Sequence, residues 1–181
     1  MKPPPKARHE SARIQALLRL GILDTPSEET FDRIARVAED LLNVPIALVT
    51  FVDTDRQWFK SCVGLEVTQT DRAVSFCGHA ILGDDLFVVA DAQADPRFAD
   101  NPLVTGAPYI RFYAGAPIRS PDGFKVGTLC VIDQRPGSLT TDQRARLRDL
   151  ADIVERELVA RTDASTDPLT VSVCRGLPTA A

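Results

Sequence analysis

The chain of 181 residues has few cysteines and no long apolar run. Cysteine stands at positions 62, 77, 130 and 174, none of them in a C-x-x-C pair, and the spacings match no zinc template. A chain of this length does not need disulfides to stabilise its core, so we expect free thiols in a reducing cytoplasm. No apolar run approaches the ~20 residues of a membrane span. The N-terminus also lacks the apolar region of a secretory signal.

Positive charge is also scarce, since 21 Lys and Arg residues stand against 25 Asp and Glu residues, which gives a net charge of −4. This balance predicts neither nucleic acid nor a membrane as a partner. The content of 44% hydrophobic and 25% charged residues is typical of a soluble globular domain. We expect a disordered, proline-rich tail over residues 1–9, one domain over residues 10–162, and a linker or tail over residues 163–181.

Two amphipathic helices are predicted near the N-terminus. The first begins near Glu10 and ends at Gly21. The second follows TPSE, residues 25–28, where we expect Thr25 as the N-cap and Glu28 as its capping-box partner. Its apolar residues recur at helical spacing until Asn43.

The middle of the chain is rich in strand-forming residues. Residues 46–53 and 56–63 are expected to form a hairpin, residues 86–92 a third strand, and residues 109–120 and 124–133 a second hairpin around the turn SPDG. Apolar residues occupy both faces of these strands, so each face needs a cover. The sequence therefore predicts an α+β fold with a central five- or six-stranded antiparallel sheet. Helices from both chain ends cover one face, and the 64–108 segment covers the other.

The last helix is expected to open at Thr140, with Gln143 as its capping-box partner. Its apolar residues form a short heptad-like seam, which either packs on the sheet of the same chain or joins two chains in a homodimer. The candidates for helical dimer contacts are Ile14, Leu17, Leu18, Leu147, Leu150, Val154 and Leu158.

Several blocks of the sequence resemble bacterial GAF domains. They are GILDTPSEETFDRIARVAEDLLNVPIALVTFVDTDRQWFKSCVGL, SFCGHAI, VVADAQADPRFADNPLVTGAPYIRFYAGAPI and GTLCVID, in this order, and they span about residues 10–161. The resemblance implies a GAF/PAS-like fold with a pocket roofed by loops and short helices. It also implies a small-molecule sensor or scaffold in signal transduction that is usually not an enzyme.

The C-terminal stretch ASTDPLT, residues 164–170, is similar to the lead-in of GGDEF diguanylate cyclase domains, and the match stops after Thr170. The GGDEF signature itself does not occur in the sequence. We therefore hypothesise the input part of a truncated or frame-shifted sensor–cyclase, with a possible signalling output protein as its partner.

Cys77 and His79, in SFCGHAI, are the most conspicuous candidates for chemistry. On a strand they would share a face, whereas on a helical turn they would diverge by about 200°. A catalytic pair needs hydrogen-bond contact between ring and sulfur, so we favour a structural or pocket-lining role. The candidates for the ligand pocket are Phe51, Trp58, Phe59, Phe76, Cys77, His79, Asp91, Arg111, Tyr113 and Cys130, each of which could also serve packing alone.

No cofactor is indicated by the sequence. Asp91 and its neighbours show no calcium-loop pattern, a glycine separates Cys77 from His79 where bilin-binding GAF domains have adjacent Cys and His, and no cyclic-nucleotide signature is found. The main hypothesis is a cytoplasmic sensory domain with an unidentified small-molecule ligand. The alternatives are a thiol-dependent reductase like the free methionine sulfoxide reductases, which needs a nucleophilic and a resolving thiol, and a ligand-free dimerisation module.

Overall fold

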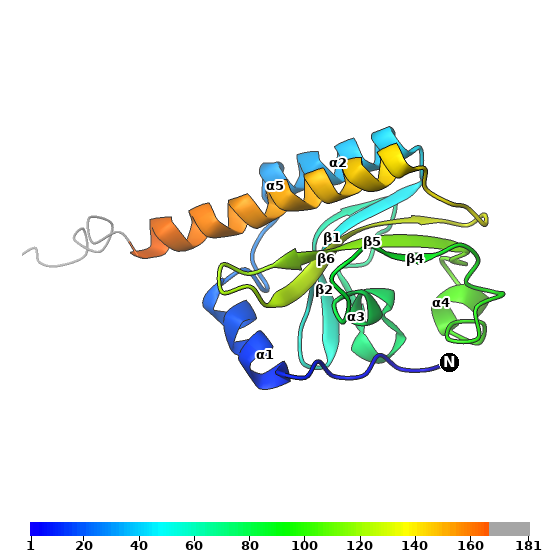
Figure 1. The fold of residues 1–181 in the computed structure, drawn as a ribbon, viewed down its shortest axis with the longest axis horizontal. Coiled ribbons are helices and arrows are strands. Elements are labelled where there is room, and N and C mark those ends of the chain that lie inside the picture. The colour runs from blue at the N-terminus through cyan, green and yellow to red at the C-terminus, as the bar shows by residue number, and fades with distance from the viewer. Residues whose placement is uncertain (167–181) are drawn as a thin grey trace, which may run out of the picture.

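Apolar residues on both sides of the central strands determine the architecture of the chain. A computed structural model describes residues 1–166 (Figure 1). Six antiparallel strands form one sheet in the order β3-β2-β1-β6-β5-β4. The strands are β1 Ile46–Val52, β2 Arg56–Val63, β3 Gln69–Asp71, β4 Phe87–Val89, β5 Phe112–Arg119 and β6 Lys125–Asp133. The helices are α1 Glu10–Arg19, α2 Glu29–Leu42, the 3₁₀ turn η1 Arg72–Val74, α3 Phe76–Ala80, α4 Pro102–Thr105 and α5 Thr141–Thr166.

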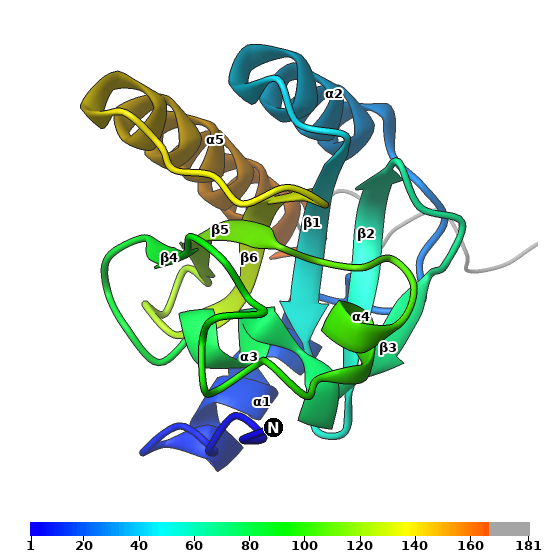
Figure 2. The same cartoon turned by 90° about the vertical axis from the view of Figure 1, so that its right-hand side faces the viewer.

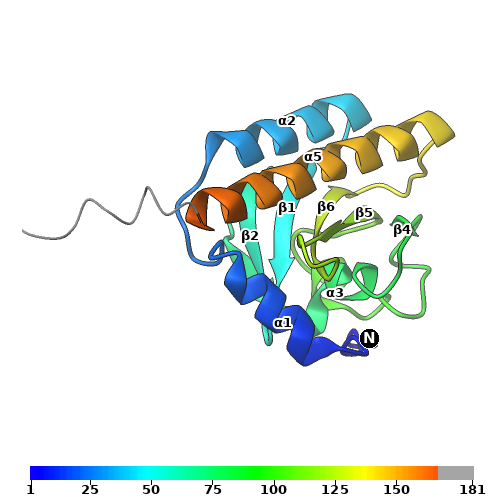
Figure 3. The same ribbon diagram turned by 60° about the vertical axis from the view of Figure 1, so that its left-hand side comes forward.

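The long helices α2 and α5 lie side by side on one face of the sheet, while α1 packs near β6 at its end (Figures 1 and 3). Their apolar residues bury against alternate residues of the strands, including Ala47 and Val49 of β1 and Leu129 and Val131 of β6. This arrangement confirms the predicted α+β fold and the hairpins.

The predicted dimer contacts are wrong for most of the residues proposed. Leu17, Leu147, Val154 and Leu158 have no exposed surface, because they fill the core between the helices and the sheet of their own chain. Ile14 and Leu150 are partly buried, and Leu18 alone is largely exposed, at 53%.

The two predicted capping boxes have different outcomes. At the start of α5, the Thr140 backbone N–H donates to Gln143 Oε1 at 2.9 Å and the Gln143 N–H donates to Thr140 Oγ1 at 3.2 Å, as expected. The box at TPSE does not form. The Thr25 hydroxyl donates to the Ile22 carbonyl, and Glu28 accepts from Lys60 Nζ at 2.6 Å, so that α2 begins at Glu29.

The second face of the sheet is covered by α3, α4 and the loops of the 64–108 segment, as predicted (Figure 2). The strand residues of the opposite parity meet this cover, among them Ile46 and Leu48 of β1 and Cys130 and Ile132 of β6. Each central strand therefore contributes one set of side chains to each of two separate clusters.

The N-terminal segment, predicted to be a disordered tail, follows a defined path over α3 in this structure. The Lys2 N–H donates to the Arg97 carbonyl at 3.1 Å, and the Lys2 carbonyl lies 3.0 Å from His79 Nε2. Pro4 packs so closely on Gly78 that a Cβ atom at this position would collide with its ring. Residues 167–181, with most of the stretch compared to GGDEF domains, lie outside the described residues.

Within residues 1–166, no helix combines the length and hydrophobicity needed to cross a bilayer. In the same part of the chain, no three His, Cys, Asp or Glu side chains are grouped closely enough to hold a metal ion.

Candidate ligand pocket

The SFCGHAI stretch forms the short helix α3, and its turns send each side chain in a different direction. Ser75 caps the helix by accepting from the Gly78 N–H at 2.9 Å. Phe76 stacks on Phe98 with ring centroids 4.0 Å apart. Cys77 points toward the sheet, whereas His79 points out toward the N-terminal segment. The two residues therefore form no catalytic pair.

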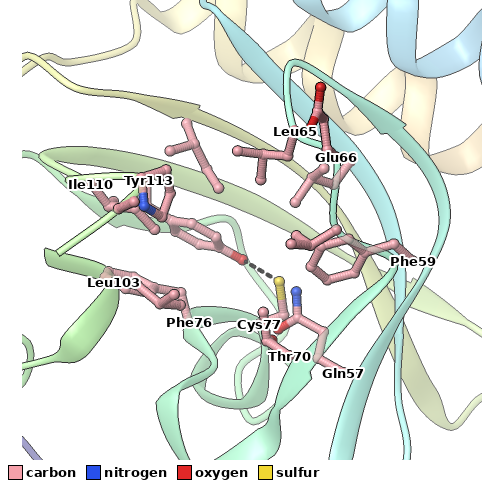
Figure 4. Close-up of a pocket in the computed structure, with 15 residues that line it drawn as sticks. Gln57, Phe59, Leu65, Glu66, Thr70, Phe76, Cys77, Leu103, Ile110 and Tyr113 are labelled. Atoms are coloured by element: carbon pink, nitrogen blue, oxygen red, sulfur yellow. Dashed lines mark hydrogen bonds between the residues drawn. The ribbon is translucent and has the colours of Figure 1, made fainter.

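A cavity of about 200 Å³ lies between the sheet and this cover. Its walls are mostly aliphatic and aromatic, and its exposed lining residues, Glu66, Val67 and Ala107, mark the mouth. The lining comprises Leu48, Gln57, Phe59, Leu65, Glu66, Val67, Thr70, Phe76, Cys77, Leu103, Ala107, Pro108, Ile110, Tyr113 and Ile132 (Figure 4).

One end of the cavity is polar because Gln57 and Thr70 lie there. The Ser75 hydroxyl oxygen already accepts from Gly78, so its proton is directed to Gln57 Oε1. The Gln57 amide nitrogen then faces the cavity, as Figure 4 shows, and no group of residues 1–166 accepts from it. Thr70 Oγ1 is buried and is likewise without a partner in this part of the chain. Two donors are therefore available at the same end.

Cys77 and Tyr113 meet beside these donors. The Tyr113 hydroxyl donates to Cys77 Sγ over 3.2 Å, and Cys130 Sγ lies 3.7 Å from Cys77 Sγ behind it. Tyr113 can lie flat on its strand because residue 115 is glycine, since a Cβ atom there would overlap the phenol ring. Burial raises the pKa of Tyr113 well above its usual value, so it remains a donor.

Four of the predicted pocket residues line the cavity together: Phe59, Phe76, Cys77 and Tyr113. Cys130 is fully buried and lies behind Cys77. Phe51 and Trp58 were placed on the wrong face. They stack on each other, with centroids 6.5 Å apart, in the cluster beneath the long helices, because their strand parity is opposite to that of Phe59.

His79, Asp91 and Arg111 do not belong to the lining. The ring of His79 is half-buried between Phe87 and the N-terminal segment. Asp91 caps its own loop by accepting from the Gln93 N–H at 3.0 Å. Arg111 precedes β5 and donates to the carbonyls of Val104 and Ile110, both at 3.0 Å, so it holds the α4 loop in place rather than binding an anion in the cavity.

The sequence analysis missed the two polar residues of the cavity and much of its aliphatic wall. Gln57 lies two residues before Phe59 on β2, so both side chains point to the same face of the sheet. Strand alternation could therefore have placed Gln57 on the cavity side. Thr70 lies in the three-residue strand β3, Leu103 in the four-residue helix α4, and Leu65 in the loop after β2. These pieces of the 64–108 segment are too short for a periodic pattern to indicate which way a side chain points.

Known proteins resemble this chain in sequence and in fold. The family model described as "GAF domain" matches residues 26–158. A cyclic di-GMP phosphodiesterase of Pseudomonas aeruginosa is 45% identical over 155 residues. The match includes 85% of this chain but only 26% of the phosphodiesterase, so the chain spans about a quarter of that protein.

Solved structures share the fold at low sequence identity. The GAF domain of an Acinetobacter phosphoenolpyruvate-protein phosphotransferase is 17% identical, with a TM-score of 0.63, over 87% of this chain and 98% of that one. Free methionine-R-sulfoxide reductase from Neisseria meningitidis, solved in complex with its substrate, is 19% identical, with a TM-score of 0.62, over 91% of this chain and 99% of that one. Because the family model covers most of the chain and the fold agrees, this protein belongs to the GAF domain family.

Proposed function

We propose that this chain is a cytoplasmic regulatory GAF domain that senses a small, neutral, mostly apolar molecule carrying one hydrogen-bond acceptor. The observation that carries this proposal is the pair of unpartnered donors, Gln57 Nε2 and Thr70 Oγ1, at one end of an otherwise apolar cavity. A buried hydroxyl without a partner, such as that of Thr70, costs ~1–3 kcal/mol, which a ligand acceptor would recover.

The size of the cavity restricts the ligand. Its volume of about 200 Å³ exceeds the ~150 Å³ of an engineered cavity that holds benzene. It lies below the ~300 Å³ at which pockets for drug-sized ligands begin. A single ring with a short substituent, or a chain of similar bulk, fits this space.

The charge of the lining restricts the ligand further. Neither lysine nor arginine occurs among the described residues that line the cavity, and its one ionisable carboxylate, Glu66, is exposed at the mouth. An anion would enter past a negative charge and find no cation inside, and an isolated buried charge is strongly disfavoured. The ligand is therefore neutral.

The reductase alternative fits this lining less well. A zwitterionic amino acid such as methionine sulfoxide requires partners for both an ammonium and a carboxylate group, and the lining provides no cation for the carboxylate. The likeness to the reductases, at 19% identity or below, concerns the fold alone. If the alternative were correct, turnover of free methionine sulfoxide would be measurable and would be lost in Cys77→Ser or Cys62→Ser.

A route from the cavity to the output helix is provided by β2. This strand carries Gln57 and Phe59 on the cavity side, and its next residue, Lys60, points to the other face with a side chain that has no exposed surface. Lys60 Nζ lies 2.6 Å from Glu28 Oε1, which also accepts from Arg161 of α5 at 2.8 Å. A ligand that shifts β2 would thereby change the contacts of the C-terminal part of α5, which amounts to a population shift.

We further propose that the output concerns cyclic di-GMP. The relative of 45% identity is named a cyclic di-GMP phosphodiesterase, and residues 164–170 resemble the lead-in of diguanylate cyclase domains. The homodimer stays a proposal with a revised surface, because α2 and α5, which pack against each other, both expose apolar side chains. These are Val37, Leu41, Ile153 and Val159.

The proposal is tested by calorimetric titration with two ligands of the same shape, acetophenone and α-methylstyrene, of which only the ketone has an acceptor. A net hydrogen bond of ~0.5–1.5 kcal/mol predicts about 2- to 13-fold tighter binding of acetophenone. The preference should disappear in Gln57→Leu and Thr70→Val and persist in Gln93→Leu, a matched change at an exposed glutamine. Absence of binding by both ligands, or equal binding, would contradict the proposal.

A further inference from the structure

Two of the described thiols face each other across the boundary between α3 and the sheet. Cys77 Sγ, from α3, and Cys130 Sγ, from the middle of β6, are 3.7 Å apart, and both residues are buried. A disulfide bond is about 2.05 Å long, so the two sulfurs stand at contact distance and need only a modest side-chain movement to bond.

The two sulfurs differ in their access to the cavity. Cys77 belongs to the cavity lining, whereas Cys130 does not and has no exposed surface. A molecule that enters through the mouth beside Glu66 and Val67 can therefore contact Cys77 Sγ, whereas Cys130 Sγ lies behind Cys77 and outside the cavity. In this arrangement Cys77 is placed as the thiol that reacts with the entering molecule, and Cys130 as the thiol that then resolves the product into a disulfide.

The surroundings of the pair favour ionisation at Cys77. Tyr113 donates to Cys77 Sγ at 3.2 Å, and the hydroxyls of Thr50 and Thr128, 3.1 Å apart, lie next to the two sulfurs. Burial raises the pKa of the Cys77 thiol, but hydrogen bonds from Cys130, Thr128, Thr50 and Tyr113 outweigh it and lower the pKa to about 7. The pKa of Cys130 is raised, because its proton is shared with Cys77 and because it is buried.

We propose that Cys77 and Cys130 form a redox-reactive pair that is oxidised to a disulfide by a small organic hydroperoxide entering the cavity. The Cys77 thiolate attacks the terminal oxygen of R–O–OH, so that an S–O bond forms and the O–O bond breaks. The departing alkoxide takes up a proton and leaves as the alcohol ROH. Cys77 is then a sulfenic acid, Cys–SOH.

The second step closes the disulfide. The Cys130 sulfur attacks Cys77 Sγ, the S–O bond breaks, and hydroxide leaves with the Cys130 proton as water. Two electrons have passed from the two thiols to the peroxide, and an external dithiol restores both thiols by exchange. The disulfide would tie α3 to β6 across one end of the cavity. This inference does not depend on a resident ligand and stands apart from the sensory proposal.

The test treats the whole chain with tert-butyl hydroperoxide, alkylates the remaining thiols in denaturant, and maps the peptides by mass. The expected product is a Cys77 peptide joined to a Cys130 peptide, with a loss of two hydrogen atoms that dithiothreitol reverses. Unchanged Cys77 and Cys130 thiols after treatment would overturn the proposal. So would a disulfide that involves Cys62 instead.

Variants assign the roles of the two sulfurs. Cys130→Ser should accumulate a sulfenic acid at Cys77 that dimedone traps, and Cys77→Ser should leave Cys130 unreacted. Cys62→Ser is the matched control, because Cys62 does not line the cavity and its thiol donates to the Leu65 carbonyl. Equal reactivity of Cys130 in the presence and absence of Cys77 would contradict the assignment. The peptide map of the unaltered chain decides the main question even if a variant fails to fold.

Discussion

The two faces of the same sheet differ in how completely they are filled. Beneath α2 and α5, side chains such as Val49, Phe31 and Leu147 pack without exposed surface. Above the other face, one residue further along each strand, there remain a cavity, two unpartnered donors and two thiols in contact. Since alternate residues of one strand serve both faces, stability and ligand recognition are separated by strand parity alone.

The largest effect is expected from truncating an aromatic residue on the filled face. Phe31→Ala should lower the free energy of unfolding by ~3–5 kcal/mol, because the dense core cannot close the space that the ring leaves. Phe59→Ala, whose ring already borders the cavity, should cost at least ~1 kcal/mol less. Chemical denaturation of both variants measures the difference. Equal losses would show that the cavity face is as tightly packed as the helix face.

The next largest effect concerns the ion pair that connects the faces. Glu28→Gln removes the negative charge beside the buried Lys60 ammonium, whose other partners, Thr25 Oγ1 and the Pro26 carbonyl, are neutral. We expect the free energy of unfolding to fall by ~2–4 kcal/mol. Hydrogen exchange should also become faster in the C-terminal part of α5, where Arg161 loses its ion pair with Glu28. Glu29→Gln, an exposed neighbour, is the control. If exchange in α5 is unchanged, β2 does not communicate with this helix as proposed.

A smaller change in the free energy of unfolding, with opposite signs, is expected for substitutions of Thr70 and Thr50. Thr70→Val should raise the free energy of unfolding of the empty protein by ~1 kcal/mol, because it removes a buried hydroxyl without a partner. Thr50→Val should lower it by about the same amount, because its hydroxyl bonds to that of Thr128 at 3.1 Å. Thermal unfolding at matched pH measures both. Destabilisation by Thr70→Val would argue against a vacant donor in the cavity.

A dependence of stability on pH is expected from Glu10 of α1, whose carboxylate pairs with Arg13 of the same helix and with Arg72 of η1. Burial raises the pKa of Glu10, but the hydrogen bonds from Arg13 and Arg72 outweigh it and lower the pKa from 4.5 to about 2. Because the folded pKa is the lower one, this stabilisation is complete above about pH 4.5 and is lost as the pH falls toward 2. Acid titration of stability should show a shallower slope in Glu10→Gln. An identical slope would exclude this contribution.

Periodic patterns were sufficient to predict most of the fold. Alternation in β1 and β6 predicted a sheet buried on both faces, and Thr140 with Gln143 predicted the start of α5. The capping box at Thr25 failed because a tertiary contact, the buried Lys60, claims the Glu28 carboxylate. A local motif gives no sign of such a competitor.

The cavity was harder to predict than the fold. Phe51 and Trp58 resemble Phe59 as ligand-stacking aromatics, and only their position relative to the sheet separates them. A β-bulge after Val49 shifts the register between β1 and β2, so parity cannot be carried reliably from one strand to the next. Thr70 and Leu103 come from segments whose side-chain directions depend on the packed structure.

The central claim, that one face of the sheet is filled and the other accepts a ligand, is tested most directly by methyl NMR during titration with acetophenone. The account predicts chemical-shift changes at the methyl groups of Leu48, Ile110 and Ile132, which line the cavity. Their neighbours on the same strands, Val49 and Val131, face the helices and should change little. Shifts confined to the helix-side methyls, or no shifts at saturating ketone, would contradict it.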